Sequence, residues 1–253
     1  MPKHVYMKFR LSYLTWFLPI CLLLMGQSCQ NEPPVIEEPM VEEPETPEPG
    51  PSISFLALGD SYTIGQSVEF SQRWPMHLYD FLQDQSVPVD TPRFIARTGW
   101  TTDELQVAMA GTSWLKDTFD LVSLLIGVNN QFRGYDFAQY EREFLELLLE
   151  AVRLAQGQKD RVFVVSIPDY GVTPFGQSRN PQQIATELDQ YNAYAFRKAD
   201  SMGIAFYNIT DISREAPNDT TLLASDQLHP SGSMYERWVK EVIGTGVQAQ
   251  LTP

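Results

Sequence analysis

Cysteine is almost absent from this sequence of 253 residues. The two cysteines, Cys21 and Cys29, lie inside or at the end of an apolar N-terminal segment. No disulfide bond can therefore crosslink the chain that follows, and that part has neither a cysteine nucleophile nor a cysteine-rich metal site. Its stability must come from a buried core, and about 200 residues are enough to build one.

Basic residues and histidines are also scarce. The sequence has 18 lysines and arginines against 32 aspartates and glutamates, for a net charge of −14. Nucleic acid is not an expected partner, because phosphate binding requires a clustered basic face. The only histidines are His4, His77 and His229, and there is no His-Glu-x-x-His pattern. A metal site is therefore the weaker interpretation, and no cofactor is expected.

The N-terminus has the layout of a signal peptide, which we assign to residues 1–28. Lys3, Lys8 and Arg10 precede an apolar run over residues 11–25. As a helix this run would extend about 22 Å, which is less than the roughly 30 Å hydrocarbon core of a bilayer. Residues 26–29 resemble a bacterial lipobox, although an aliphatic residue is usual where Gly26 stands. We expect lipidation of Cys29, with plain secretion as the alternative.

A stalk and one folded domain should follow. Residues 29–51 mix glutamate with proline, contain no lysine or arginine and offer little apolar surface, so a disordered linker is predicted. Residues 52–253 are expected to form a single domain and to be monomeric. The predicted location is the bacterial envelope, with a lipid anchor as the only membrane contact.

Within the domain, buried strands alternate with amphipathic helices. Short apolar runs predict strands at residues 53–58, 121–126, 161–167 and 204–209. Helices are expected to begin at the capping box of Thr101 and Glu104, at Asp136 and at Asn180, and a last helix at a capping box of Ser233 and Glu236. This order predicts a parallel sheet covered on both faces, with its site at the carboxyl ends of the strands.

One serine and one histidine are placed for nucleophilic chemistry. Gly59-Asp60-Ser61 directly follows the first predicted strand, where a tight turn would expose the Ser61 hydroxyl; a simple helix cap is the alternative. His4 lies in the signal segment, and His77 follows Trp74-Pro75 in a helix where a packing or surface role is favoured. This leaves His229 as the base. Asp226, three residues earlier, can reach its Nδ1 and fix the tautomer.

These motifs together resemble those of the SGNH/GDSL hydrolase family. They are Gly59-Asp60-Ser61, Gly127-Val128-Asn129 and Asp226-x-x-His229, in family order. The resemblance implies a three-layer α/β/α sandwich with a mostly parallel five-stranded, flavodoxin-like sheet. It also implies a catalytic triad of Ser61, Asp226 and His229, and an oxyanion hole formed by Ser61, Gly99 and Asn129.

The sequence departs from the family pattern at two positions. Asn130 stands where an aspartate is frequent, and Gln227 where a glycine is common. Neither change removes a reacting group. A Gly-x-Ser-x-Gly elbow of the α/β-hydrolase type is absent, as it is in the family.

The substrate is predicted only by class. Trp100, Asn130, Phe132, Arg133 and Tyr170 follow predicted strands and are expected to flank the pocket, although aromatic residues there could equally belong to the core. The expected activity is hydrolysis of carboxylic esters, such as O-acylated carbohydrates or small lipid esters, through an acyl-enzyme. The alternatives are a thioesterase or lysophospholipase of the same family, or a non-catalytic glycan-binding lipoprotein on this scaffold.

Overall fold

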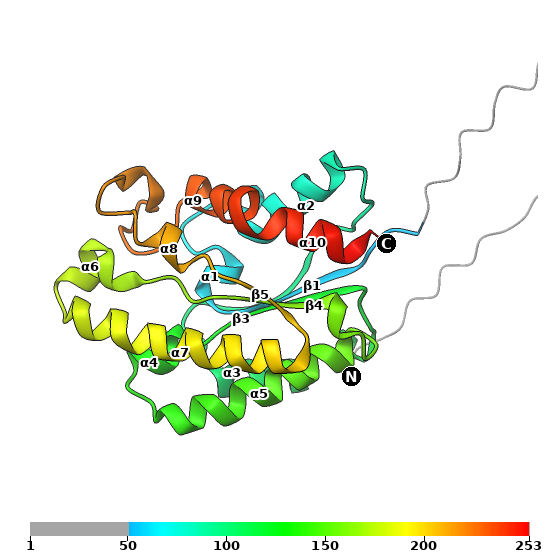
Figure 1. Cartoon of the computed structure of the whole chain (residues 1–253), viewed down its shortest axis with the longest axis horizontal. Helices are drawn as coiled ribbons and strands as arrows, with labels where there is room; N and C mark the ends of the chain where they lie inside the picture. Colours follow the sequence, from blue (N-terminus) through cyan, green and yellow to red (C-terminus); the bar gives the residue numbers. More distant parts are fainter. Residues whose placement is uncertain (1–50, 253) are drawn as a thin grey trace, which may run out of the picture. The chain divides into compact units, whose positions relative to one another are not determined.

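A five-stranded parallel sheet forms the centre of the molecule (Figure 1). The computed structural model describes residues 51–252, apart from the side chains of Trp114 and Lys116. The strands lie in the order β2-β1-β3-β4-β5. Their bounds are β1 Phe55–Gly59, β2 Arg93–Ala96, β3 Leu121–Leu125, β4 Val162–Val165 and β5 Ala205–Tyr207.

The central strands are covered on both faces. Every residue of β1, β3 and β4 is buried, which is why these segments appear in the sequence as continuous apolar runs. The edge strand β5 is half-buried and shorter than the predicted segment over residues 204–209. The predicted parallel sheet is confirmed.

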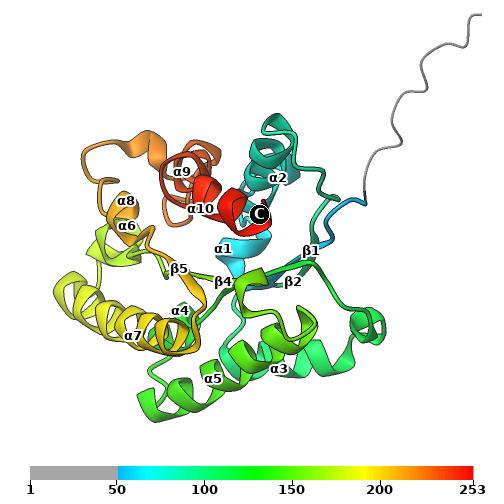
Figure 2. The same ribbon diagram turned by 45° about the vertical axis from the view of Figure 1, so that its right-hand side comes forward.

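Helices complete the three-layer sandwich. Figures 1 and 2 show α3, α5 and α7 on one face of the sheet and α2, α9 and α10 on the other. The shorter helices α1, α4, α6 and α8 gather at one end of the sheet, on the left in Figure 1. The helices are α1 Ser61–Ile64, α2 Trp74–Asp84, α3 Thr102–Gly111, α4 Val128–Phe132, α5 Phe137–Leu154, α6 Pro174–Gln177, α7 Pro181–Met202, α8 Thr210–Ser213, α9 Gly232–Arg237 and α10 Gly244–Leu251.

Most predicted helix starts are confirmed. Thr101 and Glu104 form a reciprocal capping box on α3, and the Asp136 side chain accepts a hydrogen bond from the Ala138 N–H at the start of α5. Asn180 caps α7 in the same way, with Pro181 in the first turn. Carboxylate and amide side chains satisfy N–H groups that the first turn leaves without partners.

The prediction for the last helix was wrong in detail. The cap of α9 is Ser231, whose hydroxyl accepts a hydrogen bond from the Met234 N–H, and not Ser233 with Glu236. The Ser233 hydroxyl instead contacts the Thr221 carbonyl oxygen. A π-helical segment, Trp238–Ile243, then separates α9 from α10, which the apolar periodicity did not indicate.

The predictions for the N-terminus fall outside the described residues. They are the signal peptide over residues 1–28, the lipidated Cys29 and the linker up to Gly50. Within residues 51–252, no helix combines the length and apolar character that crossing a bilayer would require.

Candidate active site

The first component of the site is Ser61, at the junction of β1 and α1. It is the first residue of α1, and the Asp60 side chain caps that helix by accepting a 3.0 Å hydrogen bond from the Tyr62 N–H. A Cβ at Gly59 would overlap the Thr63 side chain and the Leu125 carbonyl oxygen, so the chain can turn this tightly only with glycine. Ser61 thus lies at the carboxyl end of a central strand, as predicted.

The second component is a tight turn that carries Asp226 and His229. The Ala224 N–H donates to the His229 carbonyl oxygen over 2.8 Å, which closes the turn. Asp226 Oδ1 accepts from the N–H groups of Leu228 and His229, at 3.0 and 2.9 Å. Its other oxygen, Oδ2, lies 2.7 Å from His229 Nδ1. Because a carboxylate only accepts, Nδ1 carries the proton and Nε2 is left as the basic nitrogen.

Asp226 has a further partner that the sequence did not indicate. The hydroxyl of Ser67, just after α1, donates a 2.6 Å hydrogen bond to Asp226 Oδ2. Partial burial acts to raise the pKa of Asp226, but the hydrogen bonds from Ser67, His229 and the Leu228 N–H together lower it to about 2. The carboxylate is therefore ionised over the whole neutral range and holds the imidazole in one orientation.

The serine and the histidine line one pocket. This pocket has a volume of about 230 Å³, and its wall includes Ser61, Gly99, Asn129 and His229. The ring of Tyr62, the residue after Ser61, lies 5.7 Å from the His229 imidazole, centroid to centroid. Four residues that are far apart in the chain are thus brought together at the carboxyl edge of the sheet.

Two pocket residues are candidate donors to a substrate oxygen. Gly99 has φ of 89°, in the left-handed region that favours glycine. The Asn129 side-chain amide donates a 2.9 Å hydrogen bond to the Trp100 carbonyl oxygen, which fixes the amide and leaves its second N–H unused. The Arg133 guanidinium donates to the Gly99 carbonyl oxygen over 2.6 Å and pairs with Glu104 at 3.2 Å.

One wall of the pocket is aromatic. Of the five residues expected to flank it, Phe132 and Tyr170 do line it. Phe175 lines it as well and packs against Phe132 with ring centroids 5.9 Å apart. The Tyr170 hydroxyl donates a 2.9 Å hydrogen bond to Gln131, which fixes the ring. No sequence pattern indicated Phe175, because it comes from α6, a helix too short to show periodicity.

The other three expected residues need correction, because none of them lines the pocket. Trp100 takes part through its backbone carbonyl, and Arg133 supports the Gly99 loop from outside. Asn130 is fully buried and directed to Thr102. Its Oδ1 accepts from the Thr102 N–H at 3.0 Å and its Nδ2 donates to Thr102 Oγ1 at 2.7 Å. Consecutive helical residues point in different directions, so Asn129 and Asn130 cannot both face the pocket.

Asp60 is a buried carboxyl directly beside Ser61. It is 0 % exposed, and its Oδ2 has no hydrogen-bond partner among the described residues. Burial raises the pKa of Asp60 to about 7, opposed by the hydrogen bond from the Tyr62 N–H. This carboxyl is therefore largely neutral below that pH, unlike Asp226.

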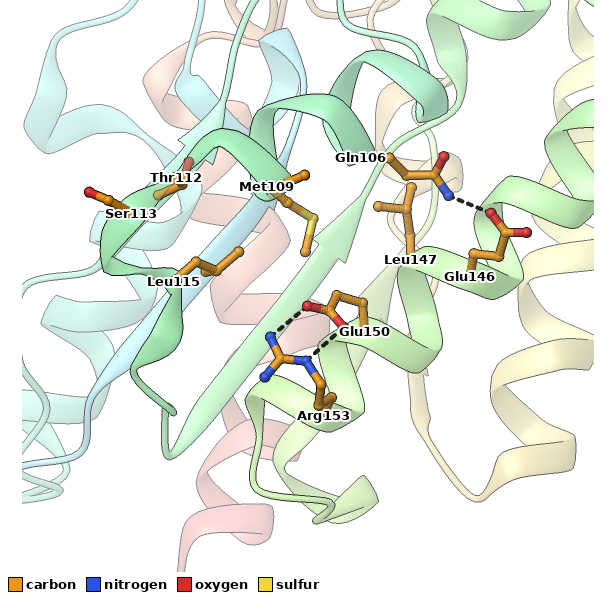
Figure 3. A pocket seen from close by; sticks show the side chains of 10 residues that line it. Gln106, Met109, Thr112, Ser113, Leu115, Glu146, Leu147, Glu150 and Arg153 are labelled. Carbon is orange, nitrogen blue, oxygen red and sulfur yellow. Dashed lines mark hydrogen bonds and ion pairs between the residues drawn. The ribbon is translucent and has the colours of Figure 1, made fainter.

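Other features lie away from this pocket. His77 is on α2, where burial lowers its pKa, and it does not line the pocket. A larger cavity of about 510 Å³ is bordered by residues of α3 and α5 (Figure 3). It is lined by Met109, Leu147 and the Glu150–Arg153 pair, among others, and by none of the candidate catalytic residues. Within residues 51–252, no three His, Cys, Asp or Glu side chains are grouped to hold a metal ion.

Solved structures share this fold. The crystal structure of TesA matches with a TM-score of 0.56 and 18 % identity, over 79 % of this chain and 98 % of that one. Axe2, an acetylxylan esterase from Geobacillus stearothermophilus, matches with a TM-score of 0.58 and 18 % identity, over 81 % and 96 % of the two chains. LAE5, an alpha/beta hydrolase enzyme from the metagenome of Lake Arreo, matches with a TM-score of 0.55 and 16 % identity, over 79 % and 94 %.

The sequence itself matches one family model. No curated protein sequence gave a match. The model of the GDSL-like lipase/acylhydrolase family covers residues 57–237, which include every candidate active-site residue described above. The chain therefore belongs to the GDSL-like lipase/acylhydrolase family.

Proposed function

We propose that this protein hydrolyses carboxylic esters, with Ser61 as nucleophile and His229 as general base. The observation that carries the proposal is the shared pocket. Ser61 and His229 line it together, and Asp226 holds His229 Nδ1 at 2.7 Å. This arrangement leaves the basic Nε2 for the serine hydroxyl. Family membership and the likeness to an esterase fold support the same reaction class.

The proposed reaction has two halves. Ser61 Oγ attacks the ester carbonyl carbon while His229 Nε2 takes its proton, and the resulting oxyanion accepts hydrogen bonds from the N–H groups of Ser61 and Gly99 and from the Asn129 amide. The tetrahedral intermediate collapses when His229 returns the proton to the leaving alcohol, which leaves an acyl-enzyme. Water, deprotonated by His229, then attacks this second ester and releases the acid and free Ser61.

The pocket supports a small apolar group next to the reacting carbon. Phe132, Tyr170, Phe175 and Leu228 contribute apolar surface to a volume of about 230 Å³. We propose short-chain esters as substrates, either O-acylated carbohydrates or small lipid esters. The acetylxylan esterase activity named for Axe2 is consistent with the first choice.

A matched set of variants tests the activity. The purified protein should hydrolyse 4-nitrophenyl acetate or butyrate, and Ser61→Ala should lower kcat/KM by at least about 10⁴-fold. Ser201→Ala, an exposed serine near the end of α7, is the control and should keep full activity. Equal turnover by the Ser61→Ala protein would rule out the proposed nucleophile. Panels of acylated sugars, lysolipids and thioesters would then rank the substrate classes.

We also propose that the protein is exported and anchored through a lipid on Cys29. The support is the signal-like layout of residues 1–28 and the lipobox resemblance of residues 26–29. Cells expressing the full chain should incorporate a labelled fatty acid into it. Cys29→Ser should abolish this incorporation and release the protein from the membrane fraction. Unchanged labelling of the variant would contradict lipidation at this residue.

A further inference from the structure

A cation lies against the aromatic wall of the pocket. Arg179 follows α6, and its guanidinium carbon is 4.6 Å from the ring centroid of Phe175 and 4.8 Å from that of Phe132. Both rings line the pocket that contains Ser61 and His229. Distances of this size are typical of cation–π contacts, which place the guanidinium close to the apolar wall.

Arg179 has no carboxylate partner among the residues that the structure describes. Two other arginines near the site differ in this respect. Arg133 pairs with Glu104 at 3.2 Å, and Arg214 pairs with Asp169 at 3.0 Å. Stacking on aromatic rings occupies the faces of a guanidinium and leaves its N–H edges open to a ligand. Arg179 is exposed, so these edges are accessible.

Two carboxylates that act on Tyr170 together with Arg179 are engaged by other groups. Glu187 accepts a 2.7 Å hydrogen bond from each of the side-chain amides of Gln131 and Gln183. Asp169 is buried and neutralised by Arg214. Arg179 is not itself among the residues that line the pocket, but within residues 51–252 it is an exposed guanidinium without a carboxylate partner that lies against two of the lining rings. A neutral acyl group would gain nothing from that charge.

We propose that Arg179 binds an anionic group of the substrate, so that the preferred esters carry a carboxylate or phosphate on the part that lies along Phe132 and Phe175. This inference rests on the proposed ester hydrolysis and narrows its substrate class. The apolar wall would accommodate a short chain, and the guanidinium would bind the anion at the far end through charge-assisted hydrogen bonds. Arg179 thereby determines specificity and takes no part in the chemical step.

Matched ester pairs test this preference. On the acyl side, 4-nitrophenyl monoesters of succinic, glutaric and adipic acid are compared with neutral 4-nitrophenyl esters of equal chain length. On the alcohol side, 4-butyryloxybenzoate is compared with 4-butyryloxybenzamide. In at least one of these pairs the charged ester should have the higher kcat/KM. The acyl series also measures how far the guanidinium lies from the reacting carbon.

Arg179→Met removes the charge and keeps an apolar chain over the two rings. The ratio of kcat/KM for charged over neutral ester should fall about five- to tenfold, because only the charged ester loses a charge-assisted contact. Arg179→Lys should retain part of the preference, and high salt should weaken it in the unmodified protein. The control is Arg197→Met, which makes the same charge change at an exposed position of α7, 18 residues after Arg179, and should leave the ratio unchanged.

The outcomes separate this inference from the proposed function. If no ester is hydrolysed faster than by Ser61→Ala, the proposed function fails. If neutral esters are hydrolysed in a Ser61-dependent way but no charged ester is preferred, or if Arg179→Met leaves the ratio unchanged, only the anion site is overturned.

Discussion

Ser67 and Asp226 are separated by 159 positions in the sequence, yet the Ser67 hydroxyl donates a 2.6 Å hydrogen bond to the carboxylate oxygen that contacts His229. Ser67 has φ of 68°, an uncommon conformation for a residue with a side chain. The segment after α1 is thus held in a strained turn that orients a donor toward the carboxylate. Through this bond the serine loop and the histidine loop are connected directly.

Removal of this donor should weaken catalysis only moderately. In Ser67→Ala, Asp226 loses one of the hydrogen bonds that lower its pKa to about 2, so the pKa should rise toward the ordinary 3.8. The carboxylate remains ionised at neutral pH, and kcat should fall about two- to tenfold with little change in KM. A fall as large as that of Asp226→Asn, about 10⁴-fold, would mean that Ser67 has a more direct role.

The same variant changes stability in acid. A carboxyl whose pKa is lowered by folding stabilises the native state above its unfolded pKa of 3.8, and this contribution is lost as the pH falls toward 2. The Ser67→Ala variant should therefore have a lower unfolding free energy than the unmodified protein at pH 7. Between pH 4 and pH 2 its unfolding free energy should fall by less than that of the unmodified protein. Denaturant unfolding of both proteins across this range measures the difference. Parallel curves would contradict the coupling.

Asp60 should have the opposite pH dependence. Burial raises its pKa to about 7, so in the folded state it stays neutral at pH values where the unfolded chain has ionised it. Its contribution to stability is complete below pH 3.8 and is lost as the pH rises to about 7. Asp60→Asn cannot ionise, so its unfolding free energy relative to the parent should improve by at most roughly 1.4 kcal/mol per pH unit between pH 4 and pH 7. A constant difference would show that Asp60 titrates normally.

Asn130→Asp, which introduces the residue frequent in related sequences, should destabilise this protein. Asn130 Nδ2 donates to Thr102 Oγ1, and that hydroxyl donates to Glu143 at 2.5 Å. An aspartate cannot donate, and it would place a second carboxylate beside the buried Glu143. We expect a loss of about 1–3 kcal/mol in unfolding free energy. The control is Glu143→Gln in the Asn130→Asp background, which should recover part of the loss; no recovery would refute like-charge repulsion as the cause.

Gln227→Gly should be tolerated because of backbone conformation. Gln227 follows Asp226 in the turn that leads to His229, and its φ is 57°. This left-handed conformation favours glycine, which is common at this position in the family. Relief of left-handed strain and the greater freedom of unfolded glycine are each worth about 1 kcal/mol and nearly cancel. Gln227→Val, with a branched Cβ, should instead cost about 1–2 kcal/mol and lower activity. Equal stability of the two variants would show that the turn is not strained.

Much of the fold could be predicted because its determinants are local. The buried strands β1, β3 and β4 appear in the sequence as apolar runs, and the Thr101–Glu104 box begins α3 as expected. The cap of α9 was misplaced by two residues because Ser231 and Ser233 are both plausible caps, and what distinguishes them is the hydrogen bond from the Met234 N–H to the Ser231 hydroxyl.

The candidate site was predictable in its reacting groups and less so in its surroundings. Because the sequence has only three histidines, His229 could be selected by elimination, and the motifs indicated Ser61 and Asp226. The catalytic roles of these three residues remain predictions. Ser67 and Phe175 gave no signal, because their importance arises from contacts across the fold. The direction of Asn130 depends on the exact start of α4, which sequence patterns do not resolve.

His229 is proposed to activate Ser61 for covalent chemistry. The most direct test is intact-mass and peptide mass spectrometry after treatment with a fluorophosphonate, which forms a stable bond to an activated serine oxygen and releases fluoride. We expect one adduct, on the peptide that contains Ser61, and almost none in His229→Ala. An adduct on another residue, or ester hydrolysis that persists while Ser61 stays unmodified, would contradict this proposal.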